Sequence, residues 1–393
     1  MIAYTANCLY TPLERIAEPL LLVEDRTIVE AASRTERAIP AGVRVVDFGD
    51  AVLAPGFVDI HIHGGAGHDV MQADAYGMDA IELLLARHGV TAYFPATVTA
   101  PLDQTCAALE RLATAIEHTT RENNSPGQRA QPLGIHLEGP FLSHVQRGVH
   151  PPQDLLSPSL LAFDRLWQAS RGQVRLMTIA PELDGAAEVI AEATRRGVCV
   201  SLGHSDADIE SARAAVAAGA RHATHVFNAM RPLHHREPGI LGQVLTDPRL
   251  SADIIADGIH LDPTIVELFL KAKGADSAVL ISDAISATGM PDGRYRLGNF
   301  DVEVRNGKCT ADGKLAGSVL TLDRAVRNVM QFANWDLQSS LRLATLNPAQ
   351  VMGLNQRGRL EAGARADIIV LSPNGEVRNT IIGGEVCAAA GRN

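Results

Sequence analysis

The feature that most constrains the fold is a repeated alternation of apolar, β-branched runs with amphipathic helical patterns. The runs are separated by about 25–40 residues, and helical patterns fill segments such as 76–88, 184–196 and 206–218. The apolar runs lie at 57–63, 91–98, 133–138, 174–180, 199–204, 223–227, 251–257 and 278–283. Nearly continuous apolar strands that alternate with helices are typical of parallel sheets covered on both faces. Eight repeats favour a (β/α)8 TIM-type barrel over a doubly wound sheet, which is the alternative. Asp206 is expected to cap the helix over 206–218, and Gly219 to end it.

Both ends of the chain are rich in short β-like runs instead. Residues 1–55 alternate such runs with turns, and residues 355–393 carry a Pro-Asn-Gly turn between two further runs. Because small open sheets need partners, we expect both ends to pair into one small β-domain beside a barrel that spans 56–354. Within the barrel segment, about 294–314 is typical of an inserted β-hairpin with Asn-Gly at its turn.

Composition excludes several classes of protein. The chain has 393 residues, a formal charge of -10 and 4% aromatic residues, which argues against a nucleic-acid partner. The apolar runs are too short to cross a bilayer, and the N-terminus lacks the pattern of a signal peptide. The 5 cysteines are far apart and form no CxxC pair, as expected for reduced thiols. We therefore expect a cytoplasmic protein without a membrane partner.

The positions of lysine and histidine narrow the chemistry. The first lysine is Lys271, so the first two-thirds of the chain have no P-loop, Schiff-base or metal-bridging lysine. All 14 histidines lie between His61 and His260, inside the predicted barrel. This concentration indicates that the barrel uses imidazole groups.

Metal-ligating residue types stand where predicted strands end. His61 and His63 share one face of the first strand because strand side chains alternate. Glu138, His204 and His225 end the third, fifth and sixth strands. Taken singly, these residues also fit a chance surface pair, a salt-bridged carboxylate or core histidines. Since the carboxyl ends of barrel strands meet at one mouth, their nitrogen and oxygen donors together predict a divalent metal site.

Two further features suggest catalysis and substrate binding. Asp283 ends the eighth strand, next to the first strand in a closed barrel, where a carboxylate can take a proton from a metal-bound water. The alternative role of Asp283 is an N-cap of the following loop. The loop 228–237 is locally basic in an acidic protein and contains Arg236, whose guanidinium suits phosphate. The alternative is a solvated charged loop.

An ordered set of motifs carries a family resemblance over essentially the whole chain. The motifs are PGFVDIHIHGG, GIHLEGPFL, SLGHSDA, THVFNAM, REPG, ADGIH, SDA and KLAGS. This set resembles the amidohydrolase superfamily and, within it, the N-acetylglucosamine-6-phosphate deacetylases. The resemblance implies a metal-bearing distorted barrel with a small β-sandwich domain built from both termini.

The resemblance also implies roles for individual residues. Glu138, His204 and His225 would hold the principal metal, and Asp283 would be the base and acid that moves the proton. Because His61 and His63 are retained, a second metal bridged by Glu138 is open to this chain. The expected cofactor is one or two divalent ions per subunit, Zn²⁺ first, with Fe²⁺, Co²⁺ or Mn²⁺ as alternatives.

Substrate contacts are implied at ten positions. Toward the sugar and its acetyl group these are Val149, His150, Asp257, His260, Leu315, Ala316 and Gly317, and toward the phosphate they are Asn228, Ala229 and Arg236. His150 would also stabilise the tetrahedral oxyanion as a hydrogen-bond donor.

The implied reaction removes acetate from N-acetylglucosamine-6-phosphate and leaves glucosamine-6-phosphate, in amino-sugar catabolism or cell-wall recycling. The implied assembly is a homodimer. Alternatives are the galacto epimer as substrate, another amidohydrolase such as a cyclic-amide hydrolase or a deaminase, and a non-enzymatic scaffold. The missing strand-four lysine counts against the cyclic-amide hydrolase, and the Glu138 motif counts against the deaminase. The presence of every candidate ligand counts against the scaffold.

Overall fold

Parallel strands alternate with helices through the central part of the chain, in a computed structural model that describes residues 1–121 and 129–387. The strands at the predicted positions are β8 (Phe57–Ile62), β11 (Val90–Pro95), β13 (Ile135–Glu138), β14 (Val174–Ile179), β15 (Cys199–Leu202), β16 (His222–Ala223), β17 (Ala252–Ile254) and β18 (Ala278–Leu280). Every residue of β8, β11, β13 and β18 is buried. Burial on both faces explains why these runs are continuously apolar rather than alternating.

The strands pair in parallel and in chain order. One sheet has the order β12-β11-β8, where β12 is Gln131–Pro132; a second runs from β13 to β16, and β17 pairs with β18. Backbone contacts link these sheets, among them Ala96 with His136, Val226 with Asp253, and Ile62 with Ala284. The carboxyl ends of the strands therefore lie at one edge, and residues after β18 adjoin β8.

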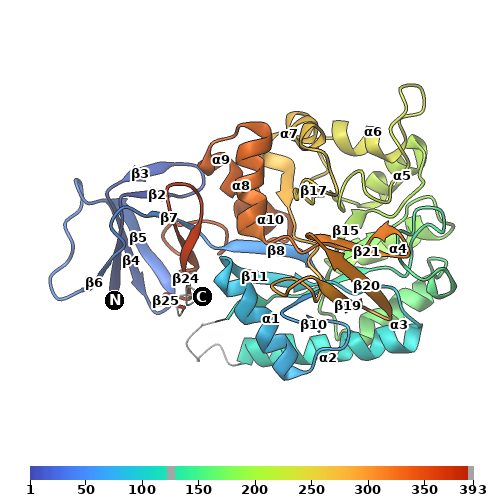
Figure 1. The fold of residues 1–393 in the computed structure, drawn as a ribbon, viewed down its shortest axis with the longest axis horizontal. Coiled ribbons are helices and arrows are strands. Elements are labelled where there is room, and N and C mark those ends of the chain that lie inside the picture. The colour runs from blue at the N-terminus through green and yellow to red at the C-terminus, as the bar shows by residue number, and fades with distance from the viewer. Residues whose placement is uncertain (122–128, 388–393) are drawn as a thin grey trace.

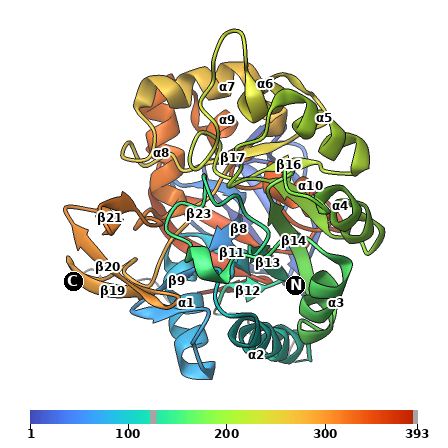
Figure 2. The same cartoon turned by 90° about the vertical axis from the view of Figure 1, so that its right-hand side faces the viewer.

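Helices surround these strands (Figure 2). They are α1 (Ala75–Arg87), α2 (Leu102–Arg121), α3 (Leu160–Ala169), η1 (Pro152–Asp154), α4 (Ala186–Arg195), α5 (Ile209–Ala218), α6 (Gly239–Thr246), α7 (Pro263–Ser277), α8 (Leu322–Ala333), α9 (Leu337–Arg342) and α10 (Leu346–Val351). The α-helices pack apolar residues toward the strands, as α1 does with Ile81 and Leu85, whereas η1 buries none of its residues. No helix among the described residues combines the length and apolar character needed to span a bilayer.

One helix cap differs from the prediction. α5 begins at Ile209, and its N-cap is Asp208, whose carboxylate accepts the N–H of Ser211 at 2.8 Å. Asp206 lies two residues before this cap, and its carboxylate instead accepts from Gln146 and Arg231. Gly219 ends the helix as predicted, with a φ of 127° that favours glycine.

The two chain ends share one sheet. A six-stranded sheet has the order β25-β24-β23-β7-β2-β3, and a four-stranded sheet has the order β5-β4-β1-β6. Their bounds are β1 (Ile2–Thr5), β2 (Cys8–Tyr10), β3 (Arg15–Ala17), β4 (Pro19–Glu24), β5 (Thr27–Ser33), β6 (Arg44–Asp47), β7 (Val52–Pro55), β23 (Ile368–Leu371), β24 (Val377–Ile382) and β25 (Glu385–Val386). Tyr4, Leu21, Leu53 and Ile381 from both sheets form one apolar cluster. The limits 1–55 and 355–393 stay a prediction, and residues 388–393 lie outside the described residues.

The predicted insert is larger than one hairpin. It is an antiparallel sheet of β19 (Gly293–Leu297), β20 (Phe300–Arg305), β21 (Lys308–Ala311) and β22 (Lys314–Leu315). The Asn306-Gly307 turn joins β20 to β21, and both residues have positive φ, as a tight hairpin requires. Further turns add a strand on each side, so the hairpin predicted over about 294–314 is incomplete. A short pair, β9 (Gly64–Gly65) with β10 (His68–Asp69), follows β8. The terminal sheets form the left-hand end of the molecule, and the insert lies away from them in its right-hand half (Figure 1).

Candidate active site

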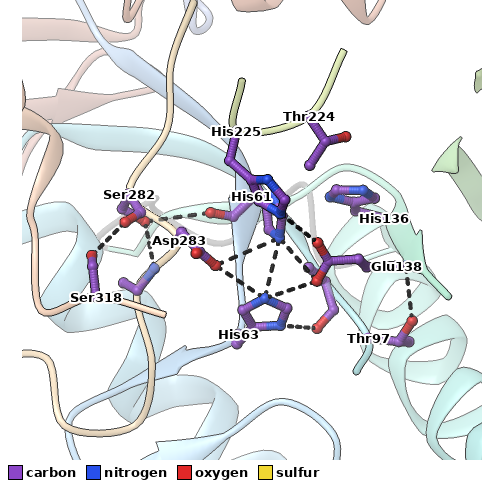
Figure 3. A network of polar contacts seen from close by, with 12 residues as sticks. His61, His63, Thr97, His136, Glu138, Thr224, His225, Ser282, Asp283 and Ser318 are labelled. Carbon is purple, nitrogen blue, oxygen red and sulfur yellow. Dashed lines mark hydrogen bonds and ion pairs between the residues drawn. The ribbon is translucent and has the colours of Figure 1, made fainter. Parts of the chain in front are cut away.

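The two histidines of the first central strand lie together at the floor of a cavity. His61 is fully buried in β8, and His63 follows the strand with 3% exposure. Their Nε2 atoms are 3.1 Å apart. Because side chains alternate along a strand, both imidazoles share a face while Ile60 and Ile62 take the opposite one. Figure 3 shows both rings directed at the carboxyl groups of Glu138 and Asp283.

Glu138, the last residue of β13, lies between two pairs of histidines. Its Oε1 atom is 3.1 Å from Nε2 of His225 and 3.3 Å from Nε2 of His204. Its Oε2 atom is 3.3 Å from Nε2 of His63 and 3.4 Å from Nε2 of His61. A metal bonded at ~2.0–2.2 Å holds neighbouring donor atoms ~3.0–3.6 Å apart. Each His-His-Glu group therefore has the spacing of a metal site, and the two groups share Glu138.

Three site residues adopt a backbone conformation that is unfavourable for side chains. The φ angles are 48° at His204, 30° at His225 and 49° at Asp283, all in the left-handed region. Such conformations cost free energy and cluster at functional sites. Here each lies two or three residues beyond the end of a short strand, where it sets the direction in which the side chain leaves the sheet.

Backbone carbonyls determine which nitrogen of two histidines faces the cavity. The Nδ1 atoms of His63 and His204 lie 3.0 Å from the carbonyl oxygens of Ala96 and Gln146. Because a carbonyl only accepts, each Nδ1 carries the hydrogen and each neutral ring directs its Nε2 lone pair at the oxygens of Glu138. The nitrogen lone pairs and the carboxylate oxygens repel one another unless a cation lies between them. The donor set therefore fits a divalent metal.

In the metal-free chain, protons compensate the carboxylates. Burial alone would lower the pKa of His63 and His225, but hydrogen bonds with Asp283 and Glu138 outweigh burial. The pKa of His63 is raised well above its usual value, and that of His225 is raised to about 9. Burial would raise the pKa of Asp283, yet its hydrogen bond with His63 and the imidazole charges lower it to about 2. Glu138 likewise stays ionised, with its pKa held well below normal against burial.

Asp283 and His150 flank the metal donors. Oδ1 of Asp283 is 3.1 Å from Nε2 of His63. Nδ1 of His150 accepts the backbone N–H of Thr99 at 3.3 Å, so the neutral ring carries its hydrogen on Nε2, which lies 3.8 Å from Oε2 of Glu138. Burial, together with the neighbouring His204, lowers the pKa of His150 to about 3. His150 is thus a neutral N–H donor beside the carboxylate of Glu138, in the same cavity lining as the ionised Asp283.

A cavity of about 290 Å³ opens above these groups. Its lining contains seven of the ten predicted substrate residues, namely Val149, His150, Asn228, Ala229, His260, Leu315 and Gly317. Leu315 comes from the inserted sheet, so the insert forms one wall of the cavity. The predicted metal residues Glu138, His63, His204 and His225 lie in the same lining with Asp283.

Three predicted substrate residues and the predicted metal ligand His61, which is fully buried, are outside that lining, as far as the described residues show. Asp257 lies behind His260, and its Oδ2 atom is 2.7 Å from Nδ1 of that ring. Ala316 is buried in the apolar cluster of the insert. Arg236 is exposed on its loop, where its guanidinium lies 3.0 Å from Nε2 of His235.

Several residues of the site were not predicted. Thr97 accepts the backbone N–H of Glu138 at 3.2 Å, and Thr99 holds His150. Their alternation in Thr97-Val98-Thr99, directly after an apolar strand, was a usable signal because it places two hydroxyls on one face. Gln146 and Lys314 also line the cavity, and no sequence pattern distinguishes them.

Comparison with known proteins agrees with this geometry. A protein described as N-acetylglucosamine-6-phosphate deacetylase from Bos taurus is 41% identical over 86% of this chain and 84% of its own length. An N-acetylgalactosamine-6-phosphate deacetylase from Escherichia coli O157:H7 is 38% identical over 89% of this chain and 91% of its own.

A solved structure is similar over almost the full length. It is N-acetyl-D-glucosamine-6-phosphate deacetylase from Mycobacterium smegmatis, in complex with N-acetyl-D-glucosamine-6-phosphate, with a TM-score of 0.90 and 34% identity over 98% of both chains. The model of the amidohydrolase family matches residues 52–387. This match covers every metal-donor residue described above, and the chain belongs to the amidohydrolase family.

Proposed function

We propose that this chain hydrolyses the acetamide of N-acetylglucosamine-6-phosphate and releases acetate and glucosamine-6-phosphate. The observation that carries the proposal is Glu138 shared by two histidine pairs, with a base, Asp283, and a donor, His150, beside them under one cavity. The names of relatives at 35–41% identity give the substrate class.

Glu138, His204 and His225 would hold the principal metal, and Glu138 with His61 and His63 would hold a second. Nitrogen and oxygen donors of this kind suit Zn²⁺, with Fe²⁺, Co²⁺ and Mn²⁺ as alternatives, and we propose one or two ions per subunit. When bound, such a metal lowers the pKa of water toward ~7 and polarises the amide carbonyl.

The side chains of this chain then move the protons. The Asp283 carboxylate accepts the proton of the attacking water as the carbon–oxygen bond forms. The Nε2–H of His150 donates to the carbonyl oxygen as negative charge develops there. When the carbon–nitrogen bond breaks, Asp283 returns its proton to the amine nitrogen, so acid and base are the same group.

The sugar phosphate extends from these groups across the cavity. Leu315, Ala316 and Gly317 close over the acetyl end. Val149 and His260 contact the sugar, and Asp257 supports His260 from behind. We assign the phosphate to the backbone of Asn228 and Ala229 and to Arg236.

The proposal includes the assembly in which the site works. The three parallel sheets form one closed (β/α)8 barrel, supported by the bridge between Ile62 and Ala284, with a β-sandwich of both termini beside it. The active form is a cytoplasmic homodimer, in which a second copy covers the exposed loop of Arg236.

The experiment is acetate release from N-acetylglucosamine-6-phosphate and from its galacto epimer, with metal content measured on the same protein. The galacto substrate is the second candidate because one relative acts on it by name. Turnover of the gluco substrate with bound metal supports the proposal. Turnover of only the galacto substrate would change the assigned substrate to the galacto epimer. Absence of turnover on both substrates would reject the proposal.

A further inference from the structure

The histidines of the cavity floor are not held in the same way. His63 and His204 each have a carbonyl partner at Nδ1, whereas Nδ1 of His225, like that of His61, is buried without a hydrogen-bond partner among the described residues. A metal-ligating imidazole is normally fixed by a partner on its second nitrogen. Another contact must therefore hold His225 in place.

The support of His225 is on its main-chain side. Its backbone N–H donates to Oδ1 of Asp253, a fully buried residue of β17. The next residue, Val226, donates its N–H to the carbonyl oxygen of Asp253 at 2.9 Å. Asp253 thus binds two successive amides at the position where the backbone takes its left-handed φ of 30°.

Asp253 is in turn held by a second buried group. Its Oδ2 atom lies 2.8 Å from Nε2 of His222, and both side chains are 0% exposed. Nδ1 of His222 lies 2.7 Å from the hydroxyl of Ser251. A buried carboxylate is costly unless both oxygens have donors, and here His222 supplies one donor and the amide of His225 the other.

We propose that Asp253, braced by His222, is a positioning residue that sets the metal affinity of the His204–His225 half of the site. Among the described residues, neither side chain lines the cavity, so both act through the main chain of His225. The inference rests on the metal-dependent function proposed above.

The test measures Zn²⁺ affinity by competition with a chromophoric chelator. It uses the full chain, and also a full chain with His61→Ala and His63→Ala, in which only one half of the site remains. Asp253→Ala should weaken Zn²⁺ binding by roughly 10- to 100-fold in both, as expected when the outer support of a ligand is lost. Asp253→Asn keeps an oxygen that can accept the amide of His225 and should restore most of the affinity.

Asp323→Ala is the matched control. Asp323 is also a buried carboxylate paired with a histidine, its Oδ1 atom 3.2 Å from Nδ1 of His88, but it contacts no metal donor in the described structure. Its removal should lower the midpoint of thermal unfolding and leave Zn²⁺ affinity unchanged.

Two results would overturn the inference: parental Zn²⁺ affinity in folded Asp253→Ala, or an equal loss of affinity in Asp323→Ala. If Asp253→Ala does not fold, His222→Ala decides, because it frees Oδ2 while leaving the carboxylate in place. Weaker Zn²⁺ binding in His222→Ala supports the inference, and parental affinity contradicts it. A parent chain that binds no Zn²⁺ contradicts the proposed function instead, so the two failures are distinguishable.

Discussion

The floor of the cavity and the loop 228–237 differ in how completely a single chain builds them. At the floor, Glu138 has a histidine nitrogen within 3.4 Å on each side, and the surrounding donors are almost fully buried. In the loop, residues 232–237 are exposed, and Arg236 contacts its neighbour His235. The reacting groups are therefore organised before the substrate arrives, whereas the loop that we propose for the phosphate is exposed.

The largest expected effect of a single side chain is at the floor. Asp283→Asn should retain bound metal but lower kcat by ~10²–10⁴-fold, because an amide cannot accept the proton of water. The measurement is kcat together with metal content, and Asp323→Asn is the control for loss of a buried carboxylate. Parental activity with full metal content would mean that Asp283 does not move the proton.

The two halves of the floor should respond differently to loss of a ligand. His204→Ala and His225→Ala each remove one of three protein donors of the principal site, so metal affinity and activity should fall together. His61→Ala should be milder if the principal metal suffices. Metal titration of the three variants distinguishes these cases. Equal losses indicate an interdependent pair of metals, and unchanged metal in His204→Ala contradicts its assignment as a ligand.

The loop should matter for phosphate alone. Arg236→Ala should remove the proposed charge-assisted hydrogen bond to the phosphate, which would be worth about 1.5–3 kcal/mol, so kcat/KM for the 6-phosphate should fall about ten- to a hundredfold. Turnover of unphosphorylated N-acetylglucosamine should hardly change. Arg294→Ala, an exposed arginine of the insert, controls for net charge. An equal loss on both substrates would show that Arg236 supports the fold or the dimer.

The pH dependence of metal binding should also distinguish floor from loop. The pKa of His225 in the metal-free chain is raised to about 9, so protonation of this ring stabilises the metal-free fold. The stabilisation is fully present below pH 6.5 and is lost as pH rises through 9. Metal must displace that proton, so affinity should rise by about tenfold per pH unit over this window for each proton released. Chelator competition from pH 6.5 to 9 measures the slope. An affinity independent of pH would contradict the protonated state of His225, and Arg236→Ala should leave the slope unchanged.

The positions of the strands were predictable because a buried parallel strand needs a continuous apolar run. The residues of the floor were predictable because metal-ligating side chains follow the ends of those runs. Glu138, His204 and His225 follow such runs directly, and the structure brings them together. The support of these ligands was not predictable from pattern. Asp253 lies within an apolar strand and Gln146 within a loop, and each acts through a pairing that depends on how distant segments pack.

For the loop 228–237 the residues were predictable from the sequence, but the contacts of their side chains were not. Composition identified 228–237 as basic, and Asn228 and Ala229 do line the cavity. Composition does not fix the direction of a long exposed side chain, because solvent contacts leave it many conformations of similar free energy. The contact between Arg236 and phosphate thus stays a prediction, although its residue was found in the sequence.

The central claim is that the buried floor is a metal centre that drives deacetylation, and reversible metal removal tests it most directly. The protein is stripped with a chelator, and acetate release from N-acetylglucosamine-6-phosphate is measured as Zn²⁺ is returned in known equivalents. We predict that the stripped protein is inactive and that activity returns in proportion to bound metal, saturating at one or two equivalents per chain. Full activity in protein shown to contain no metal would contradict the account.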